Sequence, residues 1–554
     1  MTAEERRSAA PTPGAPTAPT PGDPAASTPG TSAASTPADP ADGRKWWALG
    51  GLALSLLVVG LDLTVLNVAL PTLATSLHAS TSQLQWFANS YNLAMAVALL
   101  PGGLLGDRFG RKRMLLIALT AFGVASGFCA FASSPGQLIA WRAVLGLGAA
   151  MLIPLSMSVL TVLFTAEERP RAMGIWATAN MLGIPLGPIL GGWLLDHFWW
   201  GSVFLINLPV VVLALLAVLW LVPESRAERK PRIDVPGLAA SAVGLAAVTY
   251  GLIKAGDAGW GSAEALGPMI GGLVVLAGFV QLQRRPMQTL IDLDLFRSGG
   301  FTWGTLLATI VSFALFGLMF TLPQFYQAVE GADALGTGLR LLPLIAGLMV
   351  GVRAGQPFLP KVGPGPLIGA GFVLLTVALG IGTTTGVHTG YGFVAFWLTL
   401  GGVGVGLAMP IAMNAALDQL SPERAGVGSG LLMTIRQIGG TLAVAILGTV
   451  LNSEYRDRVG TATAALAPQD AAAVARSAGS GVAVATQKLH SPGLLESVRA
   501  ALVHATSLTM WVSAGFALVG VLAATRLRQT PRPPHPTTPH QAPESEGDLL
   551  NAAD

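Results

Sequence analysis

Charged side chains are scarce in this sequence. Only 11% of its 554 residues are Asp, Glu, Lys or Arg, whereas soluble domains carry roughly 25%. Hydrophobic residues make up 52% of the chain. This balance predicts a polytopic membrane protein. The net charge of +3 does not indicate a nucleic-acid partner, because the basic residues gather in short loops between apolar runs.

Cysteine is almost absent, because Cys129 is the only one. One thiol excludes an intramolecular disulfide, a pair of redox cysteines and a metal site built from a cysteine cluster. The sequence also has no Gly-rich Lys-Ser/Thr loop for nucleotide phosphates, and no paired His or carboxylates within an apolar run. We therefore predict a protein that is not an enzyme, holds no cofactor or metal, and is not driven by ATP.

Both ends of the chain lack apolar bulk. Residues 1–43 are rich in Pro, Ala, Thr and Ser, and residues 529–554 have a similar character. Such segments cannot bury enough apolar surface to fold, so we predict two disordered cytoplasmic tails. The first tail also lacks the apolar core of a cleavable signal peptide.

Long uncharged apolar runs fill the rest of the sequence. Since a membrane-spanning helix needs about 20 apolar residues, these runs predict an all-α protein with fourteen transmembrane helices. The predicted spans are residues 46–70, 84–105, 114–133, 137–163, 171–195, 202–222, 236–254, 265–283, 301–322, 335–357, 364–386, 391–416, 427–450 and 503–525.

Lys and Arg alternate between the connecting loops. They precede the first span and recur in most of the even-numbered loops, but are absent from the short loops 71–83, 134–136, 196–201 and 387–390. Because short cytoplasmic loops carry the excess of basic residues, both termini are predicted to be cytoplasmic. Residues 452–502 would form one long external loop with a small helical hairpin.

A dense block of charge joins the second and third spans. It reads Gly103-Leu-Leu-Gly-Asp107-Arg108-Phe-Gly110-Arg111-Lys-Arg. The glycines permit a sharp turn, and the acid can pair with the neighbouring cations. An ordinary basic loop is the simpler alternative, but such a loop would not need an acid and three glycines in this register.

This segment resembles the signature loop of the major facilitator superfamily, Gly-x-x-x-Asp-Arg-x-Gly-Arg-Lys/Arg. Fourteen spans would fit its drug:proton antiporter branch, and the resemblance covers roughly residues 46–525. It implies a six-helix bundle at residues 44–225, two peripheral linker helices within residues 226–298, and a second six-helix bundle at residues 299–528.

Two charges inside apolar runs are candidates for proton coupling. A carboxyl such as Asp62 costs about 2.5–3.5 kcal/mol at membrane depth, so it must be protonated, paired or in a wet cavity. At 1.5 Å per residue, Asp62 lies about 14 Å below Pro71. Arg142 lies about 9 Å below Gly136 by the same measure, so its side chain can reach the carboxyl.

We predict that Asp62 carries the coupling proton and that Arg142 favours its ionised form when the two are close. The resemblance agrees, because both residues fall in segments similar to the first-helix and fourth-helix motifs of the antiporter branch. The alternatives are a purely structural ion pair and an Arg142 that extends to the outer interface.

The fifth span contains the stretch Gly-Ile-Pro-Leu-Gly-Pro-Ile-Leu-Gly-Gly, which begins at Gly183. Gly183, Gly187 and Gly191 share one helix face and permit close packing, while Pro185 and Pro188 bend the helix. The stretch matches the antiporter signature Gly-x-x-x-Gly-Pro-x-x-Gly-Gly, which implies a hinge in an exporter. Generic tight packing is the alternative.

Other polar side chains within the spans either line a cavity or cross-link helices. Arg436 needs a partner or a cavity at its depth, and it would bind an anionic group or tie helices together. The candidate cavity residues are Asn67, Asn89, Asn92, Gln324, Asn414 and Arg436.

Together these features predict a proton-coupled antiporter in the cell membrane that exports small organic drugs, biocides or antibiotics by alternating access. Its partners would be this cargo, protons and the lipid bilayer, and it would act as a monomer. Asp62, the main deep acid, hints at a cationic cargo. A dedicated exporter of one antibiotic or metabolite and a membrane-embedded ligand sensor are the alternatives.

Overall fold

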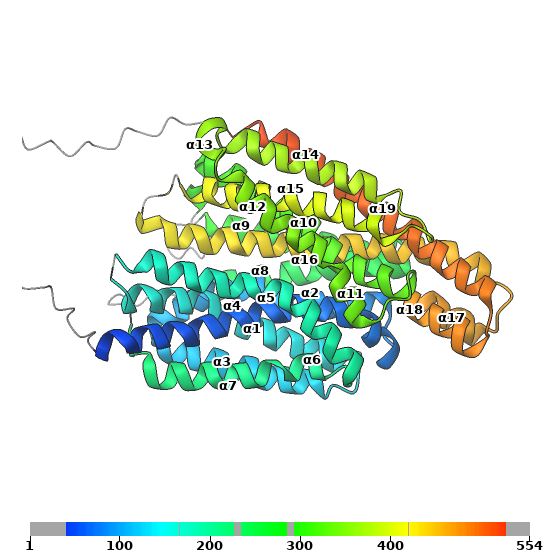
Figure 1. Cartoon of the computed structure of the whole chain (residues 1–554), viewed down its shortest axis with the longest axis horizontal. Coiled ribbons are helices and arrows are strands. Elements are labelled where there is room, and N and C mark those ends of the chain that lie inside the picture. The colour runs from blue at the N-terminus through cyan, green and yellow to red at the C-terminus, as the bar shows by residue number, and fades with distance from the viewer. Residues whose placement is uncertain are drawn as a thin grey trace, which may run out of the picture. The chain divides into compact units, whose positions relative to one another are not determined.

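The computed structural model describes residues 40–165, 167–226, 234–284, 293–418, 420 and 422–527. Within these ranges the regular structure is helical throughout, as predicted, and the long helices run side by side (Figure 1). The predicted tails lie outside the described residues, except for residues 40–43, which begin the first helix.

The helices differ in length, and several are broken by short turns. In chain order they are α1 (Pro40–Ser76), α2 (Thr81–Phe109), α3 (Arg111–Ala130), α4 (Pro135–Leu163), α5 (Arg169–His197), α6 (Ser202–Leu205), α7 (Asn207–Leu221), α8 (Val235–Ala258), α9 (Ala263–Gln283), a 3₁₀ turn (Leu293–Arg297), α10 (Gly299–Ala328), α11 (Ala334–Arg340), α12 (Leu342–Gly355), α13 (Leu359–Val362), α14 (Pro364–Gly382), α15 (Tyr391–Leu417), α16 (Pro422–Thr463), α17 (Pro468–Arg476), α18 (Ala478–Ala483), a π-helical turn (Val484–Lys488) and α19 (Pro492–Ala524).

Twelve helical segments among the described residues are long and apolar enough to cross a membrane. They coincide with twelve of the fourteen predicted spans. The other two predictions, 84–105 and 171–195, also fall on helices, because α2 and α5 are each 29 residues long. In α2 the polar side chains Gln85, Asn89 and Asn92 lower the apolar character of the helix.

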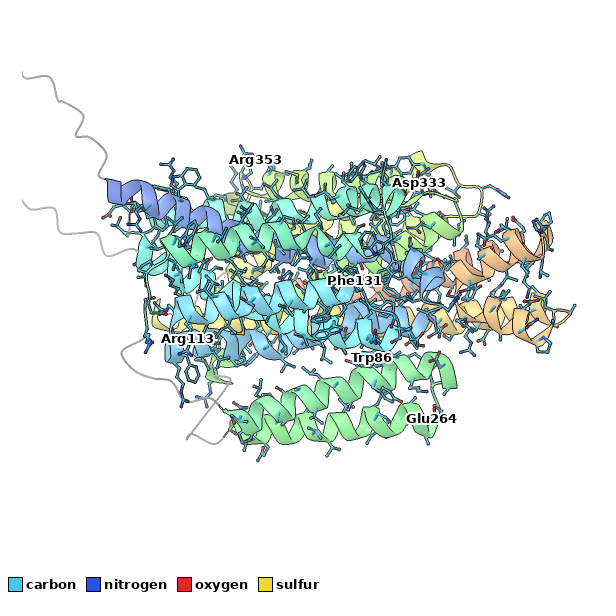
Figure 2. All side chains as sticks on the ribbon, turned by 90° about the horizontal axis from the view of Figure 1, so that it is seen from below. Trp86, Arg113, Phe131, Glu264, Asp333 and Arg353 are labelled. Carbon is cyan, nitrogen blue, oxygen red and sulfur yellow. The ribbon has the colours of Figure 1, made fainter. Side chains whose placement is uncertain are left out.

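The two ends of the bundle are named after the predicted topology. The inner end carries the loop between α2 and α3, and the outer end is opposite to it. Figure 2 shows Arg113 toward the inner end and Asp333 and Glu264 toward the outer end.

The predicted external loop 452–502 is shorter than expected, because the helices on both sides continue through much of it. α16 extends to Thr463 and α19 begins at Pro492. Between them lie α17 and α18 (Figure 1). The buried Tyr455 hydroxyl donates a hydrogen bond to the Val474 carbonyl at 3.0 Å, and Lys488 pairs with Asp470. These contacts fold the segment back onto the end of α16.

The hairpin of α8 and α9 lies against one side of the bundle (Figure 2). α8 packs against α2 and α16, and α9 packs mainly against α8. Trp86 of α2 faces Tyr250 of α8, with 6.5 Å between ring centroids. Apolar side chains such as Leu273 and Val274 are exposed on α9, as expected for a helix that faces lipid.

One carboxylate ties this hairpin to two other helices at the outer end. Asp257 of α8 accepts hydrogen bonds from Ser82 Oγ of α2 at 2.7 Å and from Asn452 Nδ2 of α16 at 3.1 Å. It also pairs with Arg456 of α16 at 3.4 Å. We call these four residues the outer clasp. One turn away, Thr449 Oγ1 donates to the Leu252 carbonyl at 2.7 Å.

The first prediction concerns this clasp. Asp257→Ala should lower the free energy of unfolding by about 1–2 kcal/mol, because it removes the acceptor of several charge-assisted hydrogen bonds at a partly exposed site. Thermal unfolding of the purified protein can be followed with a thiol-reactive fluorophore, since the only cysteine, Cys129, is buried. Asp457→Ala is the control, because Asp457 is an exposed acid that follows Arg456 in α16. Equal midpoints for the two variants would contradict the role of the clasp.

Candidate transport site

The two predicted coupling residues form a buried ion pair. Arg142 Nη1 of α4 donates to Asp62 Oδ2 of α1 at 2.6 Å, and the side chains are 2% and 0% exposed. Arg142 Nε also donates to the Phe87 carbonyl of α2 at 3.1 Å. The guanidinium lies over the Tyr91 ring, 4.5 Å from its centroid. One arginine therefore connects α1, α2 and α4.

This pairing is what makes both charges tolerable at this depth. An isolated buried charge costs several kcal/mol, and removing one partner of a buried pair leaves the other uncompensated. Only one carboxylate oxygen takes part, because Asp62 Oδ1 is buried without a hydrogen-bond partner among the described residues.

A small cavity with a partly polar lining lies beside the ion pair. Arg142, Asn67 and Asn92 contribute its polar lining, and the remaining lining residues are Leu63, Leu66, Ala88, Phe316 and Val444. These residues come from α1, α2 and α4 on one side and from α10 and α16 on the other. Three of the predicted residues thus meet between the two predicted six-helix bundles.

α2 presents a polar stripe to α16 next to this cavity. Asn92 Oδ1 accepts a hydrogen bond from Gln437 Nε2 of α16 at 2.8 Å. Asn89 and Gln85 are fully buried, and both ends of each amide lack a partner within the described ranges. Sequence reasoning missed Gln85, although its spacing of four from Asn89 and seven from Asn92 places all three on one helix face.

The remaining predicted cavity residues do not line this cavity. Gln324 is buried in α10 and donates to the Phe320 carbonyl of its own helix at 2.9 Å. Asn414 is exposed near the inner end of α15. Arg436 is half-buried in α16, next to Gln437, and its Nε has no hydrogen-bond partner among the described residues.

The charged loop between α2 and α3 forms a compact turn at the inner end. Arg111 Nε and Nη2 both donate to Asp107 Oδ1, at 3.0 and 2.9 Å. Gly110 has φ +112°, where side chains other than glycine are strained. Gly103 packs near Pro154 of α4, whereas Arg108 is exposed and lies over the Phe109 ring.

An acid beyond α7 secures this turn. Glu224 accepts hydrogen bonds from the backbone N–H groups of Lys112 and Arg113, at 3.2 and 3.3 Å. It thereby caps the start of α3, where a carboxylate is favoured by the helix dipole. The role of Glu224 was not predicted from the sequence, because the local sequence does not show which helix N-terminus a carboxylate in a loop will cap.

The glycine-rich stretch of α5 packs against a different helix with each of two faces, and the first face contacts α1. Gly183 and Gly191 pack directly against Gly60 and Val65 of α1, and Gly187 packs against Thr64. Thr64 Oγ1 also approaches the Gly183 carbonyl at 3.5 Å. The predicted small face therefore packs against the segment of α1 that holds Asp62. The side chain of Pro185 lies outside the described part of the structure.

The other face of α5 meets α11 at the outer end. Gly338 of α11 packs on the Pro188 carbonyl, and Gly192 packs on Leu335. Asp196 accepts hydrogen bonds from the backbone N–H groups of Ala334 and Leu335, at 3.2 and 3.1 Å, and so caps α11. We call this packing the outer contact. Among the described residues, α5 packs extensively against α11, and few or no contacts join it to α12.

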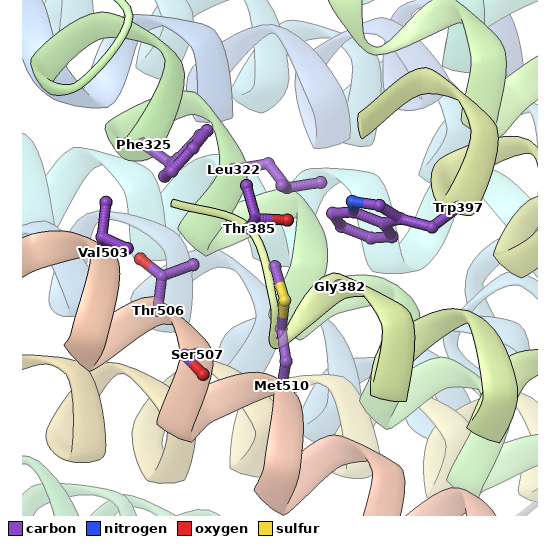
Figure 3. A pocket seen from close by; sticks show the side chains of 9 residues that line it. All are labelled: Leu322, Phe325, Gly382, Thr385, Trp397, Val503, Thr506, Ser507 and Met510. Carbon is purple, nitrogen blue, oxygen red and sulfur yellow. The ribbon is translucent and has the colours of Figure 1, made fainter. Parts of the chain in front are cut away.

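A second cavity lies within the predicted C-terminal bundle, between α10, α14, α15 and α19 (Figure 3). Trp397 Nε1, Thr385 Oγ1 and Thr506 Oγ1 are buried there without partners among the described residues. Figure 3 shows the indole nitrogen of Trp397 pointing toward Thr385. These groups were not predicted, because none of them stands out in its apolar run.

The bundle of apolar helices, the buried ion pair and the polar cavity between helices define a multi-pass membrane transporter. Its sequence matches the Major Facilitator Superfamily over residues 52–444, so the chain belongs to that superfamily. The predicted family is thereby confirmed. Membership of a transporter family, together with relatives that are transporters, makes the chain a transporter rather than an enzyme.

Two similar curated proteins are named as an antibiotic exporter and a multidrug efflux pump. The tetracenomycin C resistance and export protein of Streptomyces glaucescens is 32% identical over 498 residues, covering 87% of this chain and 91% of the relative. The multidrug efflux pump LfrA of Mycolicibacterium smegmatis is 34% identical over 492 residues, covering 86% and 96%.

Solved structures share the fold. A bacterial homologue of the human lysosomal transporter Spinster superimposes with a TM-score of 0.62 at 17% identity, covering 88% of this chain and 99% of the other. A D-xylose-proton symporter gives a TM-score of 0.56 at 14% identity, covering 87% and 97%.

The second prediction concerns the turn at the inner end. Gly110→Ala should destabilise the turn by about 1–2 kcal/mol for the left-handed backbone alone, and the added Cβ would also collide with Glu224. We expect slower transport and a lower yield of folded protein. Gly127→Ala is the matched control, because a Cβ at that position meets nothing. Equal transport rates and yields for the two variants would show that the turn does not need glycine.

Proposed function

We propose that this chain is a proton-coupled antiporter that exports small organic drugs or antibiotics from the cytoplasm across the cell membrane. The observation that carries the proposal is the buried Asp62–Arg142 pair beside a polar cavity between the two predicted bundles. The names of the similar proteins support export of drugs or antibiotics. Both termini would be cytoplasmic, and the monomeric state stays a prediction.

We also propose fourteen transmembrane helices, by adding α2 and α5 to the twelve apolar ones. At 1.5 Å per residue each of these helices is about 44 Å long, which is enough to cross a hydrocarbon core of about 30 Å. The polar stripe of α2 packs against α16 and the cavity, so it does not face lipid. Polar side chains within membranes typically occupy such protected positions.

Asp62 is the proposed proton carrier. A proton on Asp62 would neutralise the carboxylate and remove the main attraction to Arg142. The positive charge of Arg142 would then be stabilised by the Phe87 carbonyl and the Tyr91 ring of α2. Loss of the proton would restore the ion pair seen in this structure. Proton loading thus changes how strongly α1 is held to α4.

The two glycine-containing motifs would guide the movement between inward-open and outward-open states. The turn formed by Gly103, Asp107, Arg108, Gly110 and Arg111 would stabilise one of these states. In α5, the stretch from Gly183 to Gly192 would act as a hinge, because it packs on α1 with one face and on α11 with the other. The outer contact in this structure fits a state that is closed toward the outside.

A dedicated exporter of a single compound is the second candidate. It is favoured by the similarity to a resistance and export protein that is named after one antibiotic, tetracenomycin C. A transport screen against a panel of antibiotics, dyes and biocides separates the two, since only a broad-specificity pump would export several unrelated compounds.

The third prediction tests the proton carrier. Asp62→Asn should abolish substrate transport driven by an imposed pH gradient in everted vesicles, because the amide cannot exchange a proton. Substrate exchange without a gradient should persist, since the amide keeps the size and polarity of a protonated carboxyl. Asp457→Asn, at an exposed acid in α16, serves as control. Gradient-driven transport at the control rate would rule out Asp62 as the carrier.

A further inference from the structure

Positive and negative charges do not balance within the apolar runs of the predicted spans. Asp62, Arg142 and Arg436 are charged side chains within the apolar runs of three predicted spans. Asp62 and Arg142 neutralise each other, whereas Arg436 has no hydrogen bond or ion pair within the described ranges and its Nε is buried. Acids such as Asp107, Asp196, Asp257, Glu330 and Asp418 lie near helix ends.

Arg436 lies on the inner side of the polar cavity. α16 runs from the inner to the outer end, and Arg436, Gly440 and Val444 follow one another at intervals of four, so they share a helix face. Val444 lines the cavity, and so does Phe316, whose ring packs on Gly440. The neighbouring Gln437 is hydrogen-bonded to Asn92 of the cavity wall. Arg436 therefore lies on α16 about two turns below Val444, on the side from which cargo from the cytoplasm would enter.

An unpaired guanidinium at this depth is costly. A purely structural role would require hydrogen bonds or an acid to hold it, and the described residues supply neither. The five N–H donors of a guanidinium match the oxygens of an organic acid. The cavity above offers the apolar side chains of Leu63, Leu66 and Phe316 to the rest of such a molecule.

We propose that Arg436 is a specificity-determining residue that binds the anionic group of the cargo, and that the cargo is a small amphiphilic organic acid. This inference rests on the proposed export function and replaces the cationic cargo suggested by Asp62, because that carboxylate is already occupied by Arg142. The acid group would lie at Arg436 and the apolar body beside Phe316.

The charge of the cargo has a consequence for energetics. Exchange of one anion moving outward for one proton moving inward carries two charges per cycle, both in the direction favoured by an inside-negative potential. Exchange of one monovalent cation for one proton would carry no net charge. Transport of an organic acid by this chain should therefore be electrogenic.

The test compares two dyes that share a xanthene ring system. Fluorescein is anionic at neutral pH, and rhodamine 6G is cationic. Binding to the purified full-length protein is measured by fluorescence anisotropy without a pH gradient. We expect the protein to bind fluorescein more tightly than rhodamine 6G. Arg436→Gln should weaken fluorescein binding by about tenfold or more, Arg436→Lys by less, and neither should weaken rhodamine 6G binding.

Arg353→Gln is the matched control, because Arg353 is exposed near the inner end of α12. Thermal unfolding, followed with the thiol-reactive fluorophore that labels Cys129, verifies that each variant is folded. Tighter binding of the cation, no binding of fluorescein by the unaltered protein, or equal fluorescein affinity in Arg436→Gln and Arg353→Gln would each overturn the inference. Because no proton gradient is used, this outcome is independent of the transport test on Asp62→Asn.

Discussion

The ion pair between Asp62 and Arg142 is the interaction on which the rest of the site depends. Two opposite charges in helices this apolar are stable only together, so α1 and α4 must meet at this depth. The same arginine reaches the Phe87 carbonyl and the Tyr91 ring of α2. Gly146 of α4 packs on the Tyr91 backbone, which brings the helices close enough for these bonds.

The surroundings of the pair connect it to the outer contact. α5 supports α1 around Asp62 through its glycine face, and its other face packs on α11. A change in how α1 is held therefore has a short path of direct packing to the place where the two predicted bundles meet. The outer clasp at Asp257 adds a second connection, between α2, α8 and α16. The hairpin of α8 and α9 is therefore hydrogen-bonded to α2 and α16 in addition to packing against the side of the bundle.

Much of this could be predicted from the sequence, because membrane helices obey few and strict rules. Asp62 and Arg142 stand out as charges in uncharged runs, and their depths follow from the helical rise. The glycine face of α5 follows from a spacing of four. Contacts made by residues at helix ends could not be predicted in this way. Glu224 and Asp196 each cap a helix that is distant in sequence, and their partners depend on the assembled bundle.

The continuation of α16 and α19 through the predicted external loop was missed for a similar reason. Hydropathy marks where a helix leaves the membrane, but it does not mark where the helix ends. The preference for a cationic cargo illustrates a different limit. A deep acid suggests a cationic cargo only while its charge is free, and the ion pair with Arg142, which the sequence also predicts, neutralises that charge.

If Asp62 carries the coupling proton, it alternates between a protonated form and the ion pair with Arg142. Difference infrared spectroscopy of the purified protein tests this most directly, because a protonated buried carboxyl has its own carbonyl stretch. As the pH is lowered, the unaltered protein should gain this band, and Asp62→Asn should lack it. An identical band in both proteins would contradict the account.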